Sequence, residues 1–165
     1  MRIRLILLLP ALVVALALAG CAPKMVQTVE FGDPQTALRI LIATEQSEFK
    51  QAVTETLVRG LDDGALFFKI TDLRNLESEP AGSYAAIVIL STCVAWGLNP
   101  RVRAFLESPV AKEKIILLTT AGDVDWQAAV DGVDAITSAS SPADVSRVAE
   151  TLQTRIRAII VAAAS

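Results

Sequence analysis

The chain has 165 residues, of which 53% are hydrophobic, and its formal net charge at neutral pH is −3. A mildly acidic chain without a basic cluster argues against nucleic acid as a partner, because binding to phosphates needs clustered lysine and arginine. The sequence contains no histidine, which removes the commonest metal ligand and general base together with every catalytic scheme that requires one. No metal site is predicted.

The first segment, residues 1–20, predicts a lipoprotein signal peptide. Two arginines precede an apolar run over residues 5–17 that is too short for a permanent membrane span. The sequence Leu-Ala-Gly-Cys at residues 18–21 is similar to a bacterial lipobox, in which the cysteine thiol carries the lipid. We therefore expect Cys21 to be lipidated, with acyl chains such as palmitate anchoring the protein to a membrane. The alternatives are an uncleaved anchor and an ordinary signal peptide.

This segment also predicts a location in the bacterial cell envelope, on the extracytoplasmic side. Ala22, directly after the cysteine, is the kind of residue that sorting rules associate with the outer membrane, where the cell has one. With Cys21 lipidated, Cys93 has no partner within the chain, so no disulfide is expected to hold the fold.

The next residues, 21–36, contain two prolines and no helical periodicity, which predicts a tether to a domain over residues 37–165. In that domain, short apolar runs alternate with helical patterns. Several runs are continuously apolar rather than alternating, which is typical of parallel strands that are covered on both faces. The predicted strands are residues 38–43, 66–71, 85–90, 115–119 and 133–137.

Helices are predicted between these strands, each beginning at a capping residue. Ser47 precedes an apolar stripe at i+4 spacing, and Asn99-Pro100 and Ser141-Pro142 each combine a capping side chain with proline at the first turn. A shorter helix is expected around residues 126–130, and a turn or two of helix within residues 72–84.

In an open parallel sheet, ligands bind beyond the carboxyl ends of the strands. The loops that the predicted topology brings to this edge are rich in hydroxyl side chains and contain both tryptophans of the chain. They are residues 44–47, 91–99, 119–126 and 137–141.

The stretch SYAAIVILSTCVAWGLNPRVRAFLE, residues 83–107, resembles the third-strand segment of flavodoxins and flavodoxin-like proteins, and the likeness extends over residues 38–160. The resemblance implies an α/β three-layer sandwich around a five-stranded parallel sheet of order 2-1-3-4-5. It also implies FMN as the cofactor.

In that family the flavin ring lies between two loops that carry aromatic residues, after the third and fourth strands. The resemblance places Thr92 and Trp96 on the first loop, and Gly122, Asp123 and Trp126 on the second. An aromatic wall suits a flavin because stacking and exclusion of water tune its redox potential.

Flavodoxins bind the FMN phosphate in a Ser-, Thr- and Gly-rich loop after the first strand. Here the loop matches that pattern only at Thr44 and Ser47, lacks glycine, and adds Glu45 and Glu48. A carboxylate about 4 Å from a phosphate costs on the order of 4 kcal/mol at an effective dielectric near 20. The loop argues against tight FMN binding. It does not argue against riboflavin, a quinone or another planar molecule without a phosphate.

A second stretch, VDAITSASS at residues 133–141, is similar to the sequence on which some extracytoplasmic flavoproteins carry covalent FMN. That similarity implies Ser140 as the acceptor. The alternative interpretation is a strand followed by serines that cap the last helix, and Ser-Pro at a helix start explains Ser141 fully.

Two functions remain open from the sequence. In the first, a lipid-anchored domain with a degenerate flavin site binds a planar small molecule or a protein, without catalysis. In the second, FMN held by the protein passes electrons at the membrane to a redox protein. The tryptophans are a ligand clamp or core packing, and Cys93 is a reactive thiol or a half-buried small hydrophobe.

Overall fold

Six strands form one sheet in the order β1-β3-β2-β4-β5-β6 in the computed structural model, which describes residues 25–62, 64–123, 125–128 and 130–163. The predicted signal peptide and Cys21 lie outside the described residues. Strands β2 to β6 are parallel, and β1 runs antiparallel to β3. The strands are β1 (Val29–Phe31), β2 (Arg39–Thr44), β3 (Phe67–Asp72), β4 (Ala86–Thr92), β5 (Ile115–Thr120) and β6 (Asp134–Ser138).

The prediction of a five-stranded, wholly parallel sheet is therefore wrong, because β1 makes the sheet six-stranded and mixed. The five parallel strands lie among themselves as β3-β2-β4-β5-β6, and each begins and ends within two residues of a predicted apolar run. β1 was not predicted because it has only three residues. Phe31 stacks on Phe68 of β3, with ring centroids 5.1 Å apart. Since β1 lies within residues 21–36, only the residues before it can act as a tether.

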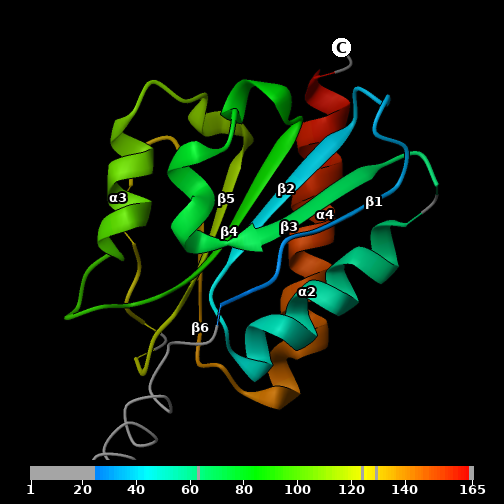
Figure 1. Ribbon diagram of the computed structural model, residues 1–165. Helices are drawn as coiled ribbons and strands as arrows, with labels where there is room; N and C mark the ends of the chain where they lie inside the picture. The colour runs from blue at the N-terminus through cyan, green and yellow to red at the C-terminus, as the bar shows by residue number, and fades with distance from the viewer. Residues whose placement is uncertain (1–24, 63, 124, 129, 164–165) are drawn as a thin grey trace, which may run out of the picture.

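The helices form two layers, one on each face of the sheet (Figure 1). Helices α2 (Glu48–Leu61) and α4 (Val145–Ala163) cover one face, and α3 (Pro100–Glu107) covers the other with the 3-10 helix η1 (Leu73–Ser78). The short helix expected around residues 126–130 is absent from the described residues of that range. Trp126, Ala128 and Val130 nevertheless pack against the core between the sheet and α3. No helix within the described ranges is long and apolar enough to cross a membrane.

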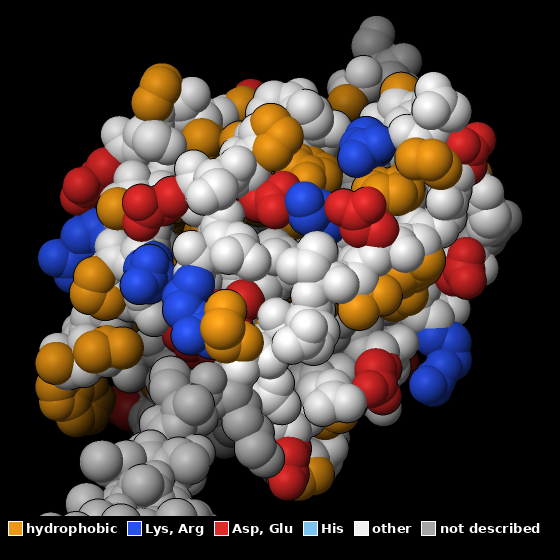
Figure 2. Space-filling model, viewed as in Figure 1, with side chains coloured by type: hydrophobic (Ala, Val, Ile, Leu, Met, Phe, Trp, Pro, Cys, Tyr) orange, Lys and Arg blue, Asp and Glu red, His pale blue; other side chains and the backbone are white. Residues whose placement is uncertain are grey.

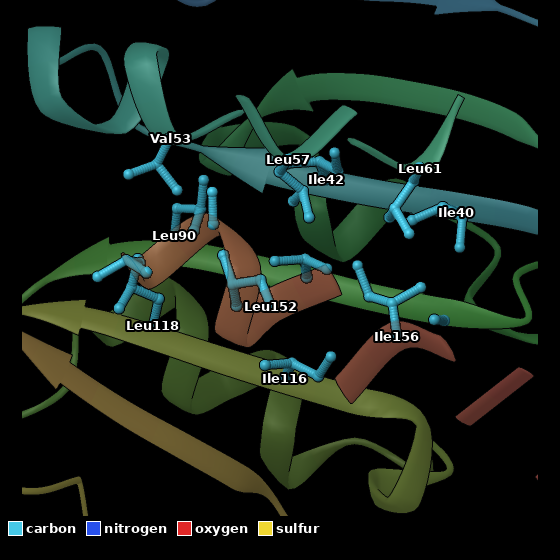
Figure 3. Close-up of a cluster of buried hydrophobic side chains, with 14 of the residues drawn as sticks. Ile40, Ile42, Val53, Leu57, Leu61, Leu90, Ile116, Leu118, Leu152 and Ile156 are labelled. Atoms are coloured by element: carbon cyan, nitrogen blue, oxygen red, sulfur yellow. The ribbon is translucent and has the colours of Figure 1, made fainter. Parts of the chain in front are cut away.

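The larger core lies between the sheet and the α2/α4 layer (Figure 3). The i+4 stripe predicted for α2 is buried, and it meets side chains of α4 over the central strands. The labelled side chains that fill this space are Ile40, Ile42, Val53, Leu57, Leu61, Leu90, Ile116, Leu118, Leu152 and Ile156. This packing fixes where α2 begins, and so where the loop after β2 lies.

Asp72, at the carboxyl end of β3, holds the start of the described chain. Its Oδ2 accepts a hydrogen bond from the backbone N–H of Val26 at 2.9 Å, and its Oδ1 accepts from the backbone and side chain of Arg74. Hydrogen bonds from Arg74, opposed by burial, lower the pKa of Asp72 to about 2. The chain before β1 is thereby attached to the carboxyl edge of the sheet.

Replacing this carboxylate is expected to destabilise the fold in a pH-dependent way. Asp72→Asn should lower the free energy of unfolding by up to about 2 kcal/mol near pH 7, the equivalent of a pKa lowered from 3.8 to about 2. The contribution is complete above the unfolded-state pKa and is lost as the pH falls through the folded-state value. The difference from wild type should therefore shrink from about pH 4 to about pH 2.

Urea unfolding followed by circular dichroism measures this difference at each pH. Asp131→Asn is the matched control, because Asp131 is exposed and its substitution should change stability little at any pH. A loss in Asp72→Asn that stays constant down to the acid limit would contradict the assignment.

Candidate functional site

The carboxyl ends of the parallel strands bring most of the predicted site residues to one edge. Thr44 ends β2, Thr92 ends β4, and the loops that follow β4 and β5 carry Trp96 and Trp126. Within this edge, the charged and polar side chains form one group around Glu45, and the tryptophans form a second.

Glu45, in the loop between β2 and α2, is held by three donors. Its Oε2 accepts from Lys50 Nζ at 3.0 Å and from Thr92 Oγ1 at 2.6 Å, and its Oε1 accepts from Asn99 Nδ2 at 2.8 Å. Lys50 Nζ also donates to Thr92 Oγ1 at 2.5 Å. We call these four residues the Glu45 cluster. A carboxylate with this many donors has little capacity left for another cation.

Lys50 is the unexpected member of the Glu45 cluster, because it is only 2% exposed. It stands in the first turn of α2, three residues before Val53 and seven before Leu57, and therefore on the apolar stripe of that helix. Side chains on a helix lean toward its N-terminus, which directs Lys50 toward the strand ends. A lysine on an apolar stripe is the sequence signal that could have identified it.

The ends of two helices position the cluster. Ser47 Oγ accepts from the backbone N–H of Lys50 at 3.2 Å, which confirms the predicted cap of α2. Asn99 Oδ1 accepts from the backbone N–H of Arg101 at 3.0 Å, which confirms the cap of α3. The amide group of Asn99 thus serves both the start of α3 and the carboxylate of Glu45.

The residues at the start of α2 do not fit the phosphate of FMN. Glu45 puts a carboxylate where the resemblance places the phosphate, and Ser47 is engaged as the helix cap. Thr44 is buried, and its Oγ1 donates to the backbone oxygen of Glu45 at 3.3 Å. The cation at this position, Lys50, already has an anionic partner. The side-chain donors closest to this position, Lys50, Thr92 and Asn99, are therefore engaged by Glu45.

Both tryptophans line one cavity of about 450 Å³ between α3 and residues 126–130. The Nε1–H of Trp126 donates to the backbone oxygen of Trp96 at 3.1 Å. Leu98, Leu106 and Ala128 contribute apolar surface. This cavity, which we call the tryptophan cavity, has the size of a small-molecule site, and its lining mixes apolar and polar side chains, Glu107 and Gln127 among them. Arg103 and Lys112 also line it.

Trp96 stands at the tip of a tight hairpin. Val94 and Gly97 exchange two backbone hydrogen bonds of 2.9 Å, so that Ala95 and Trp96 form a two-residue turn. Both turn residues have left-handed backbones, with φ of 49° and 61°. Such turns strongly prefer Asn-Gly, and a residue with a Cβ in this region costs roughly 1 kcal/mol or more. The strained turn leaves Trp96 73% exposed.

The two groups of predicted residues do not share a cavity in the described part of the chain. Thr44 and Ser47 line a separate cavity of about 270 Å³ beside β1 and α2. Thr92 belongs to the Glu45 cluster. Gly122 and Asp123 are exposed and line neither of these two cavities, and Asp123 Oδ1 accepts from the backbone N–H of Asp125.

The serines after β6 stand outside both groups. Ser140 is exposed with a left-handed backbone, φ 54°. Ser141 occupies the cap position of a short 3-10 helix, Pro142–Asp144, but its side chain makes no capping hydrogen bond, and its backbone oxygen accepts from Asp144 N–H instead. Cys93 is half-buried, and its backbone N–H donates to Thr120. No group of residues suited to a metal ion occurs within the described ranges.

The Glu45 cluster generates a stability prediction. Glu45→Ala leaves the buried ammonium of Lys50 without its carboxylate and should lower the free energy of unfolding by about 2 kcal/mol. Lys50→Met should cost less, because the partly exposed Glu45 keeps Thr92 and Asn99 as donors. The double variant should be about as stable as Lys50→Met alone.

Urea unfolding of the two single variants and the double variant gives the coupling directly. Glu113→Ala, which removes an exposed carboxylate, is the control and should change stability by only a few tenths of a kcal/mol. Additive losses in the double variant would show that Glu45 and Lys50 are not coupled.

The hairpin generates a second prediction, with the opposite sign. Ala95→Gly should raise the free energy of unfolding by about 1 kcal/mol, because glycine adopts a left-handed backbone without steric cost. Ala111→Gly is the matched control, since Ala111 is exposed with φ −72° and should gain nothing. Thermal and urea unfolding measure both, and a loss of stability in Ala95→Gly would contradict the strained conformation.

No family model and no curated protein matches this sequence. Solved structures do match. A flavodiiron core from Synechocystis sp. PCC6803 is 13% identical with a TM-score of 0.53, over 78% of this chain and 37% of that one. An oxidoreductase from Corynebacterium diphtheriae is 13% identical with a TM-score of 0.51, over 76% of this chain and 98% of that one.

A flavodoxin from the domain Archaea is 10% identical with a TM-score of 0.52, over 74% of this chain and 99% of that one. Sequence identities this low show a shared fold and do not show a shared function. The parallel strand order, the two helical layers and these likenesses together show that the chain has a flavodoxin-like α/β fold.

Proposed function

We propose that the protein is a lipid-anchored, extracytoplasmic flavodoxin-like domain that binds a planar ligand or a protein and does not hold FMN by its phosphate. The observation that carries this proposal is the carboxylate of Glu45, fixed by Lys50, Thr92 and Asn99 at the start of α2. An internal anion at this position competes with any external one.

The polar groups of the edge support a binding role rather than a catalytic one. Ser47 and Asn99 cap helices, and Lys50 and Thr92 hold Glu45. A general base or nucleophile must be free to exchange a proton or attack a substrate. These side chains instead satisfy one another and hold the loops in place.

The tryptophan cavity is the ligand site in this proposal. Its indole rings and the apolar part of its lining suit a planar molecule such as riboflavin or a quinone. Lipid on Cys21 would hold the domain on the extracytoplasmic side of the cell envelope, at the outer membrane rather than the inner one where the cell has both.

The second candidate function is an FMN-dependent electron carrier at the membrane. What favours it is the shared fold with the archaeal flavodoxin, together with tryptophans on the loops after β4 and β5. In this case the flavin would be held by its ring, or covalently on Ser140, rather than by the start of α2.

A comparison of FMN with riboflavin separates the two functions. For wild type, FMN should bind no more tightly than riboflavin, because the phosphate gains nothing beside Glu45. For FMN whose phosphate reaches the start of α2, Glu45→Ala should shift the ratio in favour of FMN by about tenfold or more, since it frees Lys50, Thr92 and Asn99.

The measurement is the quenching of flavin fluorescence on titration with protein. Glu48→Ala is the matched control, because it removes an exposed carboxylate from the same helix end without touching the Glu45 cluster. A purified protein that carries FMN rather than riboflavin, or wild type that prefers FMN strongly, would overturn the proposal and support the electron carrier. Colour that survives acid precipitation would indicate covalent flavin.

A further inference from the structure

The hairpin after β4 displays apolar side chains that the fold leaves uncovered. Trp96 is 73% exposed and Val94 is 46% exposed, and both belong to the turn whose central residues are strained. In Figure 2, a group of hydrophobic side chains lies at the lower left of the molecule, below α3. Exposed apolar surface on a strained backbone is typical of an interaction site.

The beginning of the described chain lies at the same edge of the sheet. Val26 is bound to Asp72 at the end of β3, and Asp72 lines a small cavity together with Asn99 and Arg101 at the start of α3. Figure 1 shows the described chain starting at the lower side of the sheet, where the loop between β4 and α3 also lies.

The length of chain before Val26 limits how far this edge can be from the membrane. Four residues lie between Cys21 and Val26, and the five residue-to-residue steps of an extended chain span at most about 18 Å. This step rests on the proposed lipid at Cys21. With the lipid in the bilayer, the carboxyl edge lies within reach of the headgroup layer, which is itself several ångströms deep.

The charges around the hairpin point to an apolar contact rather than an electrostatic one. Arg101 and Arg103 on α3 are exposed, but Asp123 and Asp125 on the neighbouring loop are exposed too. Mixed charges give no net attraction to an anionic lipid surface. Indole is the side chain that most favours the boundary between headgroups and acyl chains, because it is amphipathic.

We propose that the hairpin of Val94 to Gly97 docks on the bilayer that carries the lipid anchor, with the Trp96 side chain inserted at the headgroup boundary. The docked domain has the carboxyl edge of its sheet turned toward the membrane. The tryptophan cavity, which Trp96 and Gly97 line, then lies next to the lipid surface.

The test uses the full chain, expressed in a bacterium that attaches the lipid to Cys21. The protein is reconstituted into phosphatidylcholine vesicles with either brominated or ordinary acyl chains. Because the chain has only two tryptophans, Trp126→Phe leaves Trp96 as the sole indole and Trp96→Phe is the reciprocal control. Brominated lipid should reduce Trp96 emission about twofold or more, with a shift to shorter wavelength, and should quench the half-buried Trp126 clearly less.

Two further measurements distinguish docking from other causes of quenching. Should Trp126→Phe fail to fold, the difference between wild type and Trp96→Phe gives the Trp96 signal, since Trp96 is exposed and its substitution leaves the core intact. Quenching should persist in high salt, because the contact is apolar. Salt-sensitive quenching, or equal quenching of both indoles, would overturn the docking.

The mass of the peptide that begins at Cys21 tests the anchor separately. Lipid on Cys21 with unquenched Trp96 would overturn the docking and leave the anchor standing. A peptide without lipid would overturn the anchor and the proposed location. Trp96 that is quenched by an added protein and not by vesicles would identify the hairpin as a protein-binding surface and contradict the membrane contact.

Discussion

The pairing of Lys50 with Glu45 is the interaction on which the ligand edge of this protein depends. A buried ammonium is costly unless an anion and further hydrogen bonds compensate it, and the Glu45 carboxylate and the Thr92 hydroxyl supply both. The same carboxylate recruits the amide of Asn99, so one ion pair joins the loop after β2, the first turn of α2, the end of β4 and the start of α3. The charged groups of the Glu45 cluster are therefore paired with each other, within the chain.

Under the proposed function, this ion pair accounts for a flavodoxin-like fold that does not bind a phosphate at the start of α2. The hydrophobic core fixes the sheet and the start of α2. It does not determine which anion lies at the N-terminus of that helix. A fold specifies a location for a ligand, and the side chains at that location decide what binds. Here Glu45 pairs with Lys50 and Ser47 caps α2, so the start of the helix is held by side chains of the chain itself.

The sequence predicted the parallel strands well and the site only in part, for physical reasons. Continuous apolar runs such as residues 85–90 are local signals, because both faces of such a strand are buried. Strand β1 has no such run, and its three residues are held by pairing with β3 and by the contact between Thr28 and Thr71. The Glu45 cluster depends on contacts between residues about 50 positions apart, which no local pattern encodes.

The hairpin at Trp96 shows how the same edge can be rigid and still carry an exposed aromatic side chain. Strain at Ala95 and Trp96 persists only if the flanking structure holds the turn, and both flanks are held. On one side the Cys93 backbone donates to Thr120 at 2.8 Å, and on the other the Trp126 indole donates to the Trp96 oxygen. A side chain presented on a fixed backbone loses less conformational entropy when it binds, so the strain of the turn lowers the ordering cost of whatever contact Trp96 makes.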